Sequence, residues 1–121
     1  MKWNQLGIAV VGGARREQEI ARCAVAAGAE VRAYGFPWPE QGIAGVRPCA
    51  NAREALEGAD IALFPIPGIA PDGALFAPQC EQRIVPDREM LAGMRKGGHI
   101  ILGWADPKLK AHCEAMGIAL Q

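Results

Sequence analysis

Residues 8–36 read IAVVGGARREQEIARCAVAAGAEVRAYGF, a segment that passes from an apolar run to a helical pattern and back to an apolar run. The first run breaks at Gly12 and Gly13, and the helical pattern ends at Gly28. Nearly continuous apolarity is typical of strands that a parallel sheet buries on both faces, and glycine commonly follows the end of a helix. The segment therefore predicts a strand, a helix and a second strand.

Further apolar runs extend this pattern along the chain. The five expected strands cover residues 6–12, 30–36, 60–66, 99–105 and 117–121. Strands that alternate with helices form a parallel sheet, and right-handed crossovers place the helices on both of its faces. We therefore expect an α/β three-layer sandwich, flavodoxin-like or Rossmann-like, with five parallel strands in the order 2-1-3-4-5.

Helix signals stand between these runs. The expected helices are one with apolar positions Ile20, Cys23, Ala24 and Ala27, one over residues 52–57 capped by Asn51 and Glu54, one from Asp87 to about Arg95, and one that begins at Asp106 and Pro107 and ends at Gly117. The only long interruption is residues 65–86, which are rich in proline and glycine. Loops of this length are usually functional or disordered.

Composition limits the class of protein. Half of the 121 residues are hydrophobic, which suffices for one core, so residues 1–121 are expected to form a single Rossmann-like domain. Thirteen basic residues balance thirteen acidic ones, which argues against a nucleic-acid or membrane-surface partner. No apolar run reaches the ~20 residues of a membrane helix. A small molecule or another protein is the expected partner.

The four cysteines, Cys23, Cys49, Cys80 and Cys113, are far apart in sequence and form no C-x-x-C pair. No histidine stands at metal-ligand spacing from them, so we expect no metal site and reduced thiols in a cytoplasmic protein. Cys23 and Cys113 fall on predicted helices and are expected in the core. Cys80, in the long loop, is the one candidate for a reactive thiol.

In a doubly wound sheet, ligands bind beyond the carboxyl ends of the strands where the winding reverses, here after the first and third expected strands. The candidate substrate-binding residues at these ends and at the end of strand four are Gly12, Gly13, Arg15, Arg16, Pro67, Gly68 and Gly103. Glycines let a ligand approach the backbone, and arginine binds carboxylate or phosphate through paired donors. The alternative is a tight turn with solvated arginines.

A dinucleotide fingerprint requires G-x-G-x-x-G and an acidic residue at the end of strand two. Here the glycines are adjacent, Glu17 and Gln18 stand where a third glycine is needed, and strand two ends in AYGF. We therefore expect no cofactor-binding residue in this domain. His99 and His112 have no evident triad partner, and the catalytic residues stay unknown. Asp72 is expected to stabilise a turn, and Trp104 to pack in the core.

Taken together, residues 8–36 and the segment ADIALFPIPGIAPDGALF resemble the N-terminal domain of the dipicolinate synthase A-type polypeptide. That family's pattern has a first strand ending in Gly-Gly with arginine shortly after, a second ending in Gly-Phe, and a third leading into P-x-P-G. The likeness spans residues 6–105, and Ala14 departs from the acidic residue expected there.

This resemblance implies an oxidoreductase subunit of bacterial sporulation that acts on a dihydrodipicolinate-type dicarboxylate. It further implies NAD(P) bound by a second Rossmann domain outside this chain, a partner that is a flavoprotein-like B subunit, and an isolated chain without activity. The chain is then either part of a longer protein or a stand-alone relative.

A different class of function stays open, namely a non-catalytic flavodoxin-like module that binds a small anion or a partner protein. A response-regulator switch fits poorly because Asp60 begins strand three instead of ending it. Strand two is expected at a sheet edge, where Val31, Phe36 and Trp38 would offer a surface for self-association or for a second domain.

Overall fold

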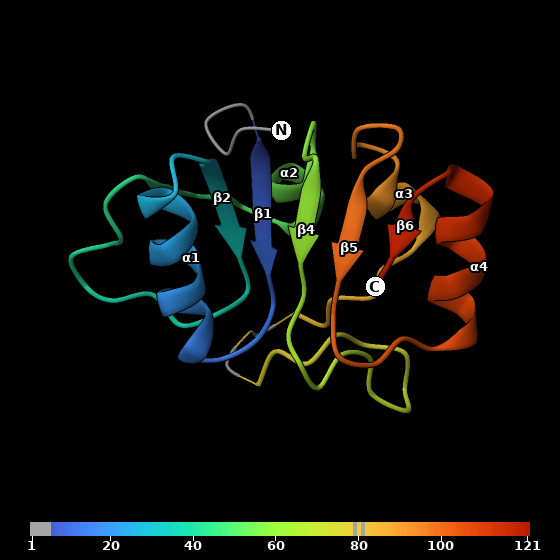
Figure 1. The fold of residues 1–121 in the computed structure, drawn as a ribbon. Coiled ribbons are helices and arrows are strands. Elements are labelled where there is room, and N and C mark those ends of the chain that lie inside the picture. The colour runs from blue at the N-terminus through green and yellow to red at the C-terminus, as the bar shows by residue number, and fades with distance from the viewer. Residues whose placement is uncertain (1–5, 79, 81) are drawn as a thin grey trace.

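The computed structural model describes residues 6–78, 80 and 82–121, which form one parallel sheet with helices on both faces (Figure 1). From edge to edge, the strands are β3 (Val46–Pro48), β2 (Glu30–Tyr34), β1 (Gly7–Val11), β4 (Ile61–Leu63), β5 (His99–Ile101) and β6 (Ala119–Leu120). The helices are α1 (Arg16–Ala26), α2 (Ala52–Leu56), α3 (Arg88–Leu91) and α4 (Pro107–Met116). This arrangement confirms the expected fold class, and all five expected strands are present in the expected order.

The sixth strand, β3, corrects the prediction for the sheet edge. It pairs in parallel with β2, so that Val31 lies opposite Val46 and Ala33 opposite Pro48. Strand β2 is therefore an inner strand, and Val31 and Phe36 are buried. Trp38 stacks on Phe36 with 5.4 Å between the ring centroids. The surface expected to support self-association is thus largely covered by the chain's own residues.

Side chains of alternate residues divide the core into two clusters, one on each face of the sheet. From β1, Ile8 and Val10 pack with α1, whereas Ala9 and Val11 pack with the elements on the opposite face. That opposite face is covered by α2, α3 and α4, and Figure 1 shows α2 and α3 behind the strands. Helix α1 stands alone on its face, over β1 and β2.

The face that carries α1 is consequently only half covered. Beyond α1, the side chains of Leu63 on β4, Ile101 on β5 and Ala119 on β6 are half-buried or exposed. Ile101 is 42% exposed although β5 is an inner strand. We refer to these three residues as the open strip.

Three of the four helices begin with the caps that the sequence predicts. The side chains of Asn51, Asp87 and Asp106 accept hydrogen bonds from the backbone N–H groups three residues later, at 2.8, 2.8 and 2.9 Å. Gly117 ends α4 in the left-handed conformation. Helix α3 ends at Leu91, earlier than the expected Arg95.

Helix α1 differs from the prediction in the face that it buries. Its buried residues are Glu17, Ala21 and Ala24, whereas Cys23 and Ala27 are exposed. The expected core position of Cys23 is therefore wrong, while Cys113 lies in the core as expected. In the described part of the chain, no helix has the length and apolarity that a membrane span requires.

Candidate functional site

The turn between β1 and α1 lies at the point where the winding of the sheet reverses, beside the carboxyl end of β4. The N–H of Gly12 donates to the Tyr34 carbonyl at 2.8 Å, and the N–H of Gly13 donates to the Phe76 carbonyl at 2.6 Å. Gly13 has a φ of +91°, and a Cβ there would overlap the Glu17 carboxylate. Both glycine amides are thus used within the protein, and Gly13 is needed for the shape of the turn.

Glu17 fills the space inside this turn. It is only 4% exposed, and its Oε1 accepts a hydrogen bond from the N–H of Ala14 at 3.0 Å. Its Oε2 is buried and has no hydrogen-bond partner among the described residues. The positive end of a helix dipole favours a carboxylate at this position, which is where dinucleotide-binding domains hold a phosphate. The protein's own acidic side chain takes the place of that phosphate.

Arg15 and Arg16 follow the turn directly, and both are exposed. Arg15 is the N-cap residue of α1, and its side chain makes no capping hydrogen bond. Within the described residues, neither arginine has an ion pair, and neither backbone N–H has a hydrogen-bond partner. Arg16 lines a groove alongside α1. Arg15 is therefore the better placed of the two for an anion at the carboxyl edge.

The loops after β4 and β5 touch through two glycines. The N–H of Gly68 closes a turn on the Pro65 carbonyl at 2.9 Å, and that of Ile69 donates to the Trp104 carbonyl at 3.0 Å. A Cβ on Gly68 would overlap the Trp104 carbonyl oxygen, and one on Gly103 would overlap the Ile66 carbonyl oxygen. These glycines permit the close approach of the two loops. Pro67, between them, is exposed.

Residues 65–86 are held against the carboxyl ends of the strands by backbone hydrogen bonds. The N–H of Phe76 donates to the Gly68 carbonyl at 2.9 Å, and that of Leu75 donates to the Ile84 carbonyl at 2.7 Å. Asp72 accepts from the N–H of Ala74 at 3.0 Å, which is the turn-stabilising role that the sequence favours. The loop after β4 is thereby joined to the turn after β1, because Phe76 also binds Gly13.

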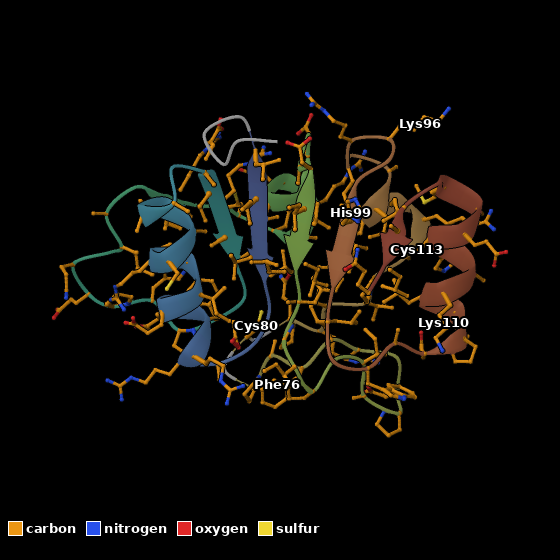
Figure 2. The ribbon with its side chains drawn as sticks, in the orientation of Figure 1. Phe76, Cys80, Lys96, His99, Lys110 and Cys113 are labelled. Carbon is orange, nitrogen blue, oxygen red and sulfur yellow. The ribbon has the colours of Figure 1, made fainter. Side chains whose placement is uncertain are left out.

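Large apolar side chains are exposed at this same edge. Ile66 and Phe76 come from the long loop, and Trp104 follows β5. Trp104 is 54% exposed, so the expectation of a packed tryptophan is wrong. Figure 2 shows Phe76 and Cys80 at the end of the sheet where the first turn of α1 lies. Exposed apolar groups beside two unpaired arginines are the features of a binding surface.

A contact that the sequence did not predict joins Tyr34 and Cys80. The Cys80 thiol lies 3.7 Å from the Tyr34 hydroxyl oxygen. This contact, and then burial, raise the pKa of Tyr34 above its ordinary value of 10.0, so the hydroxyl keeps its proton at neutral pH. Tyr34 also lines a cavity of about 250 Å³ with Asn51, Arg53 and Arg83. The position of Tyr34 at the end of a predicted strand was the only sequence signal for it.

The histidines lie away from these groups. His99 is the first residue of β5, at the amino end of the strand, and its Nδ1 is 3.1 Å from Nε2 of Gln121 (Figure 2). Nδ1 of His112 accepts from Nε of Arg88 at 3.3 Å. In the part of the chain that the structure describes, no cluster of histidine, cysteine and carboxylate side chains is suited to a metal ion.

Comparison with solved structures places the fold among dehydrogenase-like domains. The chain is similar to the A chain of dipicolinate synthase from Bacillus subtilis, with 23% identity and a TM-score of 0.80 over 96% of this chain and 39% of that one. The corresponding dipicolinate synthase chain from Bacillus halodurans has 21% identity and a TM-score of 0.80, over 94% of this chain and 39% of that one. An NAD-complexed D-isomer specific 2-hydroxyacid dehydrogenase from Lactobacillus delbrueckii ssp. bulgaricus has 17% identity and a TM-score of 0.71, over 100% of this chain and 36% of that one.

At these identities the structural matches establish the fold, and the chain spans less than half the length of each matched protein. No curated protein sequence matches the chain. Residues 7–121 match the DpaA_N family, the N-terminal domain of the A-type polypeptide of dipicolinate synthase, and the chain therefore belongs to that family.

Proposed function

We propose that this domain binds the dicarboxylate substrate of a dipicolinate-synthase-like oxidoreductase at the carboxyl edge of its sheet. The observation that carries the proposal is the pair of exposed, unpaired arginines at the point where the winding reverses. A dicarboxylate that leaves water needs a compensating cation, and arginine supplies paired donors for a carboxylate. The substrate class comes from the family, and it is a dihydrodipicolinate-type dicarboxylate of bacterial sporulation.

Arg15 is the principal anion-binding residue in this proposal. The amides of Gly12, Gly13 and Ala14 already have partners within the protein, so they add little to anion binding. The free N–H groups of Arg15 and Arg16 at the start of α1 complement the guanidinium group. Pro67, Gly68 and Gly103 shape the neighbouring loops, and Arg16 contributes less because it lines the groove beside α1.

The nicotinamide cofactor, NAD(P), binds to a second domain in this proposal, and a flavoprotein-like B subunit is the further partner. Related folds occur in NAD-complexed dehydrogenases that are more than twice as long as this chain. Glu17 supports the absence of a cofactor site here, because its carboxylate occupies the position that a dinucleotide phosphate requires. The isolated chain is then inactive and does not bind NADH at micromolar concentration.

Calorimetric titration of the purified chain with dipicolinate, the aromatic dicarboxylate product, tests the proposal. Arg15→Ala is expected to weaken binding by about tenfold or more, because a hydrogen bond to a charged group contributes about 1.5–3 kcal/mol. Arg22→Ala is the matched control, since Arg22 lies on the same helix and pairs with Glu19. Equal affinity of the wild-type chain and of both the Arg15→Ala and Arg16→Ala variants would show that the turn is structural.

The same titration separates this function from the alternative. A non-catalytic module for a partner protein predicts no binding of dipicolinate by the wild-type chain. A module that binds small anions without selectivity predicts equal affinity for dipicolinate and for a monocarboxylate such as benzoate. Preference for the dicarboxylate, lost in Arg15→Ala, is the result expected for the substrate-binding domain.

A further inference from the structure

A groove of about 440 Å³ runs between α1 and the open strip. Its apolar wall includes Ile20, Cys23 and Ala27 from α1, and Leu63 from β4. Arg16 and Glu19 line it toward the start of α1. The apolar positions of α1 that the sequence assigned to the core therefore face this groove instead.

The open strip continues the groove across the sheet. Leu63 lies opposite Ile101 in the parallel pairing of β4 with β5, and paired residues of neighbouring strands project to the same face. Parallel sheets are normally covered on both faces, because their strands are apolar on both sides. On the opposite face of the same strands, Ala62 and Ile100 are fully buried. The exposed side is thus the exception in this sheet.

The size of the uncovered area fits a single helix. Neighbouring strands are about 4.8 Å apart, so the area from β4 to β6 is about 10 Å wide. Packed helices have axes about 8–10 Å apart. One helix placed beside α1 covers both the groove and the open strip, and the small side chains of Ala24 and Ala27 allow it to approach closely.

A second copy of this chain does not supply that helix. The outward side of α1 carries Arg16, Glu19 and Arg22, and the exposed residues of α4 include Lys108, Lys110 and Glu114. Burying such charges against an apolar strip costs several kcal/mol when they stay unpaired. In the described residues, neither of these longer helices offers an apolar outer face.

We propose that the groove and the open strip bind one amphipathic helix of a partner polypeptide, which packs beside α1 and completes the helical layer on this face. Its apolar stripe contacts Leu63 and Ile101, with small residues toward Ala24 and Ala27. An acidic residue at the end near Arg16 pairs with that arginine, because Glu19 is already paired with Arg22. The solved family members contain more than half of their chain outside the matched region, which shows that additional polypeptide accompanies such domains.

The test uses a synthetic helical peptide with a leucine and alanine stripe and one acidic end, and a scrambled peptide of the same composition as its control. Cys23 is the reporter, because its exposed thiol lines the groove. The helical peptide is expected to slow alkylation of Cys23 by iodoacetamide by about fivefold or more at saturation, as mass spectrometry of the labelled peptide measures. The scrambled peptide is expected to leave the rate unchanged.

Two variants make the result specific. Ile101→Glu places a charge on the open strip and is expected to weaken peptide binding by about tenfold or more. Val85→Glu is the matched control, since Val85 is 40% exposed but does not line the groove. Urea unfolding checks that both variants fold, which is expected because both side chains are exposed.

Three results would overturn the proposal. One is a lack of Cys23 protection by the helical peptide, and another is equal peptide binding by Ile101→Glu and the wild-type chain. The third is a wild-type dimer that dissociates in Ile101→Glu by sedimentation, which would identify a second copy as the occupant.

Discussion

Ile100 and Ile101 are neighbours in β5, yet Ile100 is 0% exposed and Ile101 is 42% exposed. Ile100 points to the face covered by α2, α3 and α4, whereas Ile101 points to the face that carries α1 alone. The two residues have the same chemistry and the same strand geometry. Their difference shows that an apolar strand residue reports a sheet, while its burial depends on what packs across from it.

Two cysteines repeat this contrast on the helices. Cys113 of α4 is buried in the cluster that covers one face, and Cys23 of α1 is exposed beside the open strip. Both occupy apolar positions in helical patterns. The helices of the two faces therefore differ in how completely the rest of the chain covers them.

The largest expected effect is on the buried isoleucine. Ile100→Ala is expected to lower the free energy of unfolding by about 2–5 kcal/mol, because it leaves a cavity in a closely packed core. Ile101→Ala is expected to change it by less than about 0.5 kcal/mol, as for other exposed positions. Urea unfolding of both variants measures the difference. Similar losses would mean that the open strip is already covered in solution.

A smaller effect distinguishes the helices by their caps. Asp106→Ala is expected to destabilise the protein by about 1 kcal/mol, because the N–H of Leu109 loses its acceptor at the start of α4. Arg15→Ala, at the corresponding position of α1, is expected to cost less than about 0.5 kcal/mol because its side chain makes no capping bond. Thermal unfolding followed by circular dichroism is the measurement. A loss for Arg15→Ala as large as that for Asp106→Ala would contradict the assignment.

The smallest effect concerns the buried thiol at alkaline pH. Burial raises the pKa of Cys113 above its ordinary value of 9.0, so the folded protein holds that proton more tightly than the unfolded chain. Its contribution to stability is complete below the unfolded pKa and is lost as the pH rises through the higher folded value. Cys113→Ala is expected to flatten the fall of the free energy of unfolding above pH 9.

Urea unfolding at several pH values from neutral to alkaline compares the slopes. Some slope is expected to persist in Cys113→Ala, because burial also raises the pKa of Cys49. An unchanged slope in the variant would show that the Cys113 thiol is solvated in the folded protein.

At the site, the sequence located the turn after β1 and the loop after β4 correctly, because parallel strands bring their carboxyl ends to one edge. It did not reveal that Gly68 and Gly103 serve the contact between two loops, since that role depends on residues far apart in the chain. Nor did it reveal the burial of Glu17, because an acidic residue in the first turn of a helix is usually solvated.

By itself, the sequence determined the strands, their order, the caps of α2, α3 and α4, and the family resemblance. These features rest on local patterns, because a cap bonds three residues away and a buried parallel strand is apolar along its whole length. Only the tertiary structure decided which faces are covered, where β3 pairs, and that Tyr34 meets Cys80. The physical reason is that these properties depend on contacts between distant segments, and such contacts leave no periodic pattern in the residues that make them.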